Sequence, residues 1–255
     1  MANWNPGNLV AADAVELLPA VIDRLKRFGF LENDFELQGG TSRELLLKSL
    51  QDARFEASGQ NAPVLHIDRH LLNSLLVKKC RAAAGKEAPP PQSRETAWPN
   101  RRISFSIGNM ALLNRKGLNE SAIRGGVRLA AMQWNQVCSM ALEEVASEPD
   151  ILIEAVSPDP HPVGEQIAHA DYPGDNNLFG FPLLIHLDSR ESWTLGSEPF
   201  SYDLVRTVMH GLGHCLGLFH YPGTLMNPTI YPEDDQRSIE PVIQDRILDL
   251  YPIET

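Results

Sequence analysis

The chain has 255 residues, of which 43% are hydrophobic and 22% charged, so it can bury a core and is not disordered by composition. Acidic residues outnumber basic ones by 11, and the whole excess falls in residues 98–255, which argues against a nucleic-acid partner because phosphate backbones are also negative. No apolar run approaches the ~20 residues that span a bilayer and no secretory signal is recognisable, so we expect no membrane contact.

Helical patterns dominate residues 1–87. Apolar residues recur at helical spacing from Val15 to Leu25, a second helix is expected to open at Ser42, and Asp68 can cap a third. These patterns predict a three-helix domain. The proline-rich tract that follows is too stiff and too polar for a core, so residues 88–97 are predicted to be a linker.

Strand and helix patterns alternate after the linker and predict a second, α/β domain over residues 98–255. Alternating or continuous apolar runs indicate the strands, and amphipathic runs indicate the helices. A long loop rich in Pro, Gly, Asp and Asn is expected over 157–180. The expected strands are 102–107, 150–156 and 183–188, and the expected helices are 119–137, 202–216 and 240–251.

The histidines carry the main chemical signal, since six of the eight lie between His161 and His220. His210 and His214 are four residues apart, so on a helix their rings project from one face and can bind one zinc ion. Gly217 can turn the chain back so that His220 reaches the same ion. Ordinary core or surface histidines are the alternative, but the complete spacing favours a zinc site with an open fourth position, as catalytic sites have.

The segment HGLGHCLGLFH resembles the zinc-binding segment of metzincin metalloproteases, and the nearer match is to their matrixin branch. Met226 stands where that family has its Met-turn. The resemblance covers nearly the whole chain. It implies a twisted mixed sheet with three helices, preceded by a three-helix propeptide similar to peptidoglycan-binding modules. It also implies a secreted, monomeric zinc metalloendopeptidase that acts on protein or peptide substrates.

Gly211 departs from this pattern, because the family has glutamate there. That carboxylate accepts a proton from the attacking water and delivers it to the leaving amine. Glycine can do neither, so we expect a catalytically disabled chain. The sequence shows no sign of close packing that would require glycine. We therefore favour an introduced Glu→Gly change over a natural pseudoprotease that binds zinc and peptide without turnover.

Two further metal sites follow from the resemblance. It implies a structural zinc on His169 and His186 and a calcium ion on Asp188 and Glu191. The His-x-Asp pair that matrixins place ahead of these histidines is missing here. Ordinary strand histidines and a solvated acidic loop therefore stay open as alternatives.

Latency and specificity are also implied. Matrixin propeptides end in a cysteine whose thiolate fills the open position of zinc, and Cys80 stands at the corresponding place without the flanking Pro and Asp. Its basic neighbours would lower the pKa of the thiol and favour the thiolate, while an inert free thiol is the alternative. Pro228 and Ile230 follow Met226 and are expected to line an apolar pocket for the substrate side chain after the scissile bond.

Three functions therefore remain in view. The first is a protease zymogen held inactive in cis by its own propeptide, and the second is the pseudoprotease. The third is a binding protein whose residues 1–87 recognise cell-wall glycan. The proline-rich linker and Cys80 favour the first.

Overall fold

The computed structural model of the chain divides into two compact units, Met1–Val77 and Lys78–Thr255. The predicted boundary at residue 87 stays a prediction, because most of the proline-rich tract lies outside the described residues. The described residues are 18–27, 31–32, 34–37, 40–58, 67, 78–79, 81–82, 97–113, 118–157, 166–174, 180–196, 198, 201–232 and 234–252.

The first unit contains helices α1 (Leu18–Arg27) and α2 (Gly40–Ser58). Their apolar faces are buried, as the helical spacing predicts; the buried residues include Leu18, Val21, Leu25, Leu46 and Leu50. Helix α2 begins two residues before the expected Ser42. The third expected helix, after Asp68, lies outside the described residues, so the three-helix propeptide remains a prediction.

A six-stranded mixed sheet forms the centre of the second unit, in the order β2-β6-β7-β5-β3-β4. Strand β7 runs parallel to β5, which runs parallel to β3, whereas the short β6 runs antiparallel to β7. This arrangement matches the mixed α/β sheet that the resemblance implies. The strands are β2 (Arg81–Ala82), β3 (Arg102–Ile107), β4 (Ala141–Glu144), β5 (Ile151–Val156), β6 (Ala168–Ala170) and β7 (Leu183–Asp188).

Four shorter strands form two small ladders outside this sheet. Strand β8 (Trp193–Thr194) pairs with β9 (Tyr202–Asp203) in parallel. Strand β1 (Lys78–Lys79) pairs with β10 (Thr229–Ile230) in the antiparallel direction. A single turn of 3₁₀ helix, η4, spans Ala111–Leu113.

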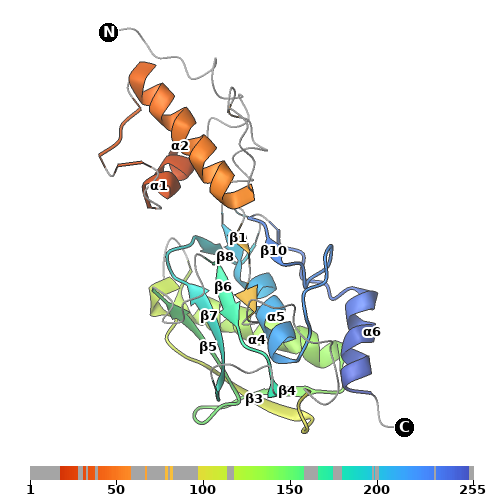
Figure 1. Cartoon of the computed structure of the whole chain (residues 1–255). Coiled ribbons are helices and arrows are strands. Elements are labelled where there is room, and N and C mark those ends of the chain that lie inside the picture. The colour runs from red at the N-terminus through yellow and green to blue at the C-terminus, as the bar shows by residue number, and fades with distance from the viewer. Residues whose placement is uncertain are drawn as a thin grey trace. The chain divides into compact units, whose positions relative to one another are not determined.

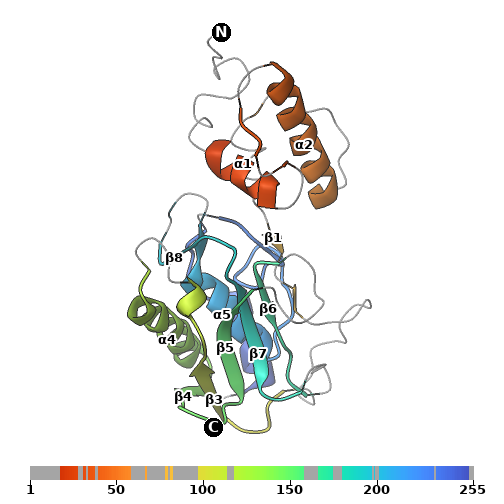
Figure 2. The same cartoon turned by 90° about the vertical axis from the view of Figure 1, so that its left-hand side faces the viewer.

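Helices α4 (Glu120–Val137) and α5 (Leu204–Cys215) lie side by side against one face of the sheet, and α6 (Pro241–Leu250) follows near the C-terminus (Figures 1 and 2). Asn119 caps α4 through its side chain, and the indole of Trp134 donates to the Met209 carbonyl at 2.9 Å, which joins α4 to α5. In the described ranges, no helix is long and apolar enough to cross a bilayer.

The sequence-based predictions agree with the structure where apolar patterns are strong and miss short elements. Strands 102–107 and 183–188 have the expected bounds. Strand β4 is not among the expected strands, because it lies at the sheet edge and exposes both its glutamates. The loop predicted over 157–180 is interrupted by β6, which pairs with β7 where the resemblance to matrixins implies a strand around His169.

The central strands predict a stability test. Ile153 on β5 is fully buried, so Ile153→Ala should lower the free energy of unfolding by about 2–5 kcal/mol through lost burial and an unfilled cavity. Met132 on α4 is 48% exposed, and Met132→Ala should change it by less than about 0.5 kcal/mol. Urea denaturation followed by circular dichroism measures both. Equal effects would contradict the assigned core.

Candidate metal centre

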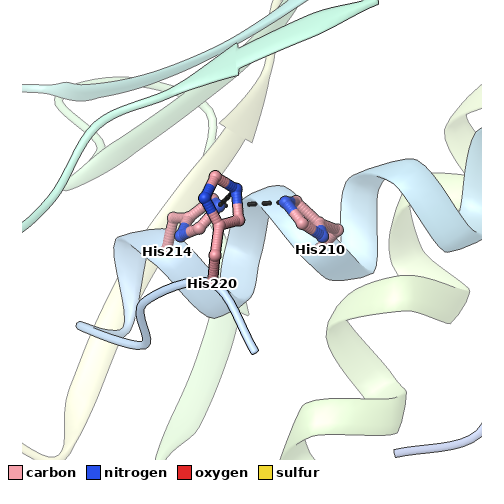
Figure 3. Close-up of side chains that lie close together, drawn as sticks. All are labelled: His210, His214 and His220. Atoms are coloured by element: carbon pink, nitrogen blue, oxygen red, sulfur yellow. Dashed lines mark hydrogen bonds between the residues drawn. The ribbon is translucent and has the colours of Figure 1, made fainter. Parts of the chain in front are cut away.

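Three imidazoles converge on one point beside α5. His210 and His214 lie one turn apart on that helix, and His220 follows its end (Figure 3). The Nε2 atom of His214 lies 2.9 Å from that of His210 and 3.2 Å from that of His220. A tetrahedral zinc ion at about 2.0–2.1 Å from each nitrogen would hold such atoms about 3.3 Å apart. The spacing therefore fits a shared ion.

The backbone fixes which ring nitrogens can bind a metal. His210 Nδ1 lies 2.8 Å from the Leu225 carbonyl oxygen, and His214 Nδ1 lies 2.7 Å from that of Leu218. Because a carbonyl only accepts hydrogen bonds, each Nδ1 must carry the proton. In the neutral rings the two Nε2 atoms then present lone pairs toward each other. Such facing lone pairs repel unless a cation lies between them, which supports a metal site.

Burial keeps these rings neutral. His210 and His214 are fully buried, and His220 is half-buried. Desolvation, followed by the charge of His220, lowers the pKa of His210 to about 3, and desolvation lowers the pKa of His220 to about 4. Desolvation also takes the pKa of His214 well below its usual range. Neutral imidazole, the metal-binding form, is therefore present near pH 7.

Gly217 turns the chain from α5 toward His220. Its φ is +95°, in the left-handed region that favours glycine. The Gly217 N–H donates to the His214 carbonyl at 2.8 Å, and the Leu218 N–H donates to the Gly213 carbonyl at 2.9 Å. This pair of bonds is a Schellman motif, which ends the helix. The same turn presents the Leu218 carbonyl to His214.

The turn around Met226 packs against α5. A Cβ atom added to Gly213 would lie 2.5 Å from Met226 Sδ and 3.1 Å from the Trp134 ring, so only glycine lets the helix approach this closely. The carboxylate of Glu240 accepts the Leu225 N–H and thereby holds the carbonyl that orients His210. Sequence reasoning missed Leu225, Leu218 and Glu240, because backbone carbonyls and their supports carry no signature in side-chain spacing.

The expectation that nothing packs closely against Gly211 is wrong. An added Cβ there would lie 3.0 Å from Ile185 Cγ2 and 3.3 Å from its Cδ1. Ile185 lies on β7, so α5 rests directly on the sheet at the position where matrixins have the catalytic glutamate. A larger residue at 211 needs Ile185 to move by a few tenths of an ångström.

The expected structural-zinc histidines are brought together. His169 on β6 and His186 on β7 face each other across the antiparallel pair, with ring centroids 5.9 Å apart. Carboxylates lie near both rings: His169 Nε2 is 3.2 Å from Asp171 Oδ1, and His186 Nε2 is 3.6 Å from Glu154 Oε1. In the part of the chain that the structure describes, the group of three that could hold a metal is the His210 cluster, so the second zinc stays a prediction.

The expected calcium ligands meet an internal cation instead. Arg190 donates to both carboxylate oxygens of Asp188, with Nε 2.9 Å from Oδ1 and Nη2 2.7 Å from Oδ2. Glu191 is buried next to this pair. A calcium ion would have to displace the Arg190 guanidinium from Asp188, so the donor set fits calcium poorly in this conformation.

The remaining site residues lie on or near β10. Ile230 is fully buried and Pro228, just before the strand, is half-buried. Their role as the lining of a substrate pocket stays a prediction. Cys80 lies outside the described residues.

A two-histidine helix, a glycine turn and a third histidine below a mixed sheet define a metal-binding site of the metallopeptidase type. A family model for the matrixins matches residues 97–251, more than half of the chain. The chain therefore belongs to the matrixin family. Membership places it in a lineage of zinc-dependent metalloendopeptidases.

Individual relatives agree with this assignment. Stromelysin-2 of Rattus norvegicus is 34% identical over 130 residues, covering 48% of this chain and 25% of that protein. Matrix metalloproteinase-23 of Bos taurus is 30% identical over 168 residues, covering 54% and 41%. Interstitial collagenase of Sus scrofa is 32% identical over 152 residues, covering 55% and 30%. The matched part spans less than half the length of each relative.

The geometry predicts a metal-binding phenotype. Full-length protein saturated with zinc should lose the ion on His214→Gln, because two nitrogens remain and the substitute amide is a weak zinc ligand. Met132→Gln places the same amide at an exposed position of α4 and should leave bound zinc unchanged. Metal content after gel filtration, measured by mass spectrometry, decides between these outcomes. Zinc retained by His214→Gln would contradict the site.

The close approach at Gly213 predicts opposite effects for two helical glycines. Gly213→Ala should cost about 1–3 kcal/mol of stability, because its methyl group meets Met226 and Trp134. An added Cβ at Gly125 on α4 meets nothing within 4 Å, so Gly125→Ala should stabilise the protein by up to about 1 kcal/mol. Thermal unfolding measures both. A neutral Gly213→Ala would show that the Met226 turn is not packed as described.

Proposed function

We propose that this chain is a latent zinc metalloendopeptidase that hydrolyses peptide bonds in protein substrates. Its main support is the convergence of three histidine Nε2 atoms: that of His214 lies 2.9 Å from that of His210 and 3.2 Å from that of His220. His210, His214 and His220 would hold the zinc ion. Zinc bound there supplies Lewis-acid chemistry, polarising the scissile carbonyl and lowering the pKa of water.

The other residues bind and orient in this proposal. The Leu225 and Leu218 carbonyls hold the two helical rings in the tautomer that binds metal. Met226 supports the floor of the site, and Pro228 with Ile230 forms the wall that contacts the substrate side chain. Position 211 is where a general base would take a proton from water, and glycine supplies none. The chain as it stands is therefore expected to be inactive or nearly so.

The strands that flank Cys80 in the sequence support latency. Strand β1 ends at Lys79 and pairs with β10, while β2 begins at Arg81 and runs parallel to β6 with Arg81 opposite His169. The residues before and after position 80 are thus paired with two different strands, β10 and β6. This supports Cys80 as a thiolate ligand that fills the fourth zinc position until the propeptide is removed. Cleavage near residues 85–97 would then release the site.

A natural pseudoprotease is the second candidate, and one observation favours it. Ile185 packs against Gly211 so closely that the backbone there is already part of the core. A glycine accommodated in this way is expected of a chain that has long lacked the glutamate. In that case the centre would bind zinc and peptide without turnover.

Restoring the base tests the proposal. In full-length protein carrying Cys80→Ser, Gly211→Glu should raise zinc-dependent peptide cleavage by about 10²–10⁴, the contribution of a general base. Gly211→Gln adds similar volume without a base and should leave the rate low. Because Ile185 crowds the position, Gly211→Glu is also assayed with Ile185→Ala. A peptide library read by mass spectrometry reports cleavage, and none in either glutamate variant would rule out the protease.

Cobalt substitution tests the thiolate ligand. Full-length protein loaded with Co²⁺ should show a thiolate-to-metal charge-transfer band in the near ultraviolet, which Cys80→Ser abolishes. Cys138 is half-buried and its pKa is raised by burial, so Cys138→Ser should leave the band intact. A spectrum that does not respond to Cys80→Ser would exclude the thiol lock while leaving the histidine site in place.

A further inference from the structure

Arg206 is a buried cation whose hydrogen-bonding capacity is largely unused. Its side chain is 5% exposed, and Nη2 lies 2.8 Å from Asp234 Oδ2. Within the described part of the chain, its Nε and Nη1 atoms are buried and have no hydrogen-bond partner. These two atoms carry three of the five N–H donors of the guanidinium. Buried donors are normally paired, so this arrangement points to an acceptor that arrives from outside.

Arg237, which shares this region, has more of its guanidinium donors paired than Arg206 has. Arg237 donates to both oxygens of Asp203 and to the Leu195 carbonyl. Asp203 also caps α5 by accepting the Arg206 backbone N–H at 2.7 Å. The Asp203 carboxylate therefore binds Arg237 and the N-terminus of α5. Among the described residues, Asp234 is the carboxylate that forms an ion pair with the Arg206 side chain.

The position of Arg206 relates it to the metal centre. It lies four residues before His210 on α5, so both side chains leave the same face of the helix, one turn apart. The positive charge of Arg206 also acts on His210, whose pKa it helps to lower. Its partner Asp234 follows β10 by four residues. The guanidinium thus lies between the first turn of α5 and the chain that leaves β10.

Strand β10 accepts an extended chain along its edge. In the structure β1 occupies that edge, with Lys78 opposite Ile230 and Lys79 opposite Thr229. A substrate strand that replaces β1 would lie along Thr229 and Ile230, on the strand that precedes Asp234, the ion-pair partner of Arg206.

We infer that Arg206 forms a carboxylate-binding subsite for the residue that follows the scissile bond, so that the centre prefers substrates with glutamate or aspartate there. A carboxylate can accept the three unused N–H donors, and charge-assisted hydrogen bonds in a buried site are strong. Such a subsite would add a charged group to the apolar pocket that is predicted at Pro228 and Ile230. The inference rests on the proposed function, since it requires a peptide along β10.

The test uses binding, so it does not depend on turnover. Full-length protein with Cys80→Ala is loaded with zinc and titrated with two peptide hydroxamates. The hydroxamate chelates zinc and fixes which side chain lies beside the metal. One probe carries a glutamate side chain in that position and the other carries glutamine, which has the same shape without the charge. The dissociation constants come from calorimetry.

We expect the acidic probe to bind about tenfold more tightly than the amide probe, or better. Arg206→Leu should bring the ratio to about one, Arg206→Lys should keep part of it, and Asp234→Asn should increase it by removing the competing carboxylate. Arg102→Leu removes the same charge from an exposed residue of β3 and should leave the ratio unchanged. If Arg206→Leu does not fold, the ratios of acidic-probe to amide-probe affinity in Arg206→Lys and Asp234→Asn test the inference instead.

Two results would overturn the inference, and they differ in meaning. Equal affinity for both probes in the parent protein would show that Arg206 serves only its ion pair with Asp234, while the proposed peptide site would stand. If neither probe binds the zinc-loaded protein, the proposed function falls, and the inference with it.

Discussion

Two nitrogen lone pairs that face each other in the interior, with a third imidazole beside them, are the constraint on which the rest of this structure depends. Burial keeps His210 and His214 neutral, and the carbonyls behind them force the remaining lone pairs inward. Such an arrangement is unfavourable without a cation. The elements around it each supply one part of that geometry: α5 gives two rings, the Gly217 turn gives the third, and the Met226 turn holds the first in place.

Helix α5 meets that constraint by being packed tightly on two sides. Ile185 approaches it from the sheet at Gly211, and Met226 approaches from the turn at Gly213. These contacts hold the two imidazoles in register to within the tolerance that a metal requires. Position 211 therefore matters for both catalysis and packing, because matrixins have their general base there and α5 contacts β7 there. A glycine at position 211 is therefore compatible with the framework of the centre.

The sequence predicts those parts of the molecule that a periodic pattern encodes. Strands β3 and β7, the body of α4 and the histidine spacing on α5 are such parts. Strand β6 is too short for a pattern and exists because it pairs with β7. The packing of Ile185 on Gly211 and the ion pair that holds Arg206 depend on side chains meeting across 26 and 28 residues respectively, which residue spacing does not report. The ion pair between Arg190 and Asp188 is local in sequence, but the resemblance to a calcium site led us to expect a metal ligand at Asp188 instead.

Crystals of the full-length protein grown with zinc give the most direct test, through anomalous diffraction at the zinc absorption edge. We expect one strong peak about 2.0–2.1 Å from the Nε2 atoms of His210, His214 and His220. An empty map at that point, or three rings that have turned away from one another, would contradict a shared metal ion at this centre.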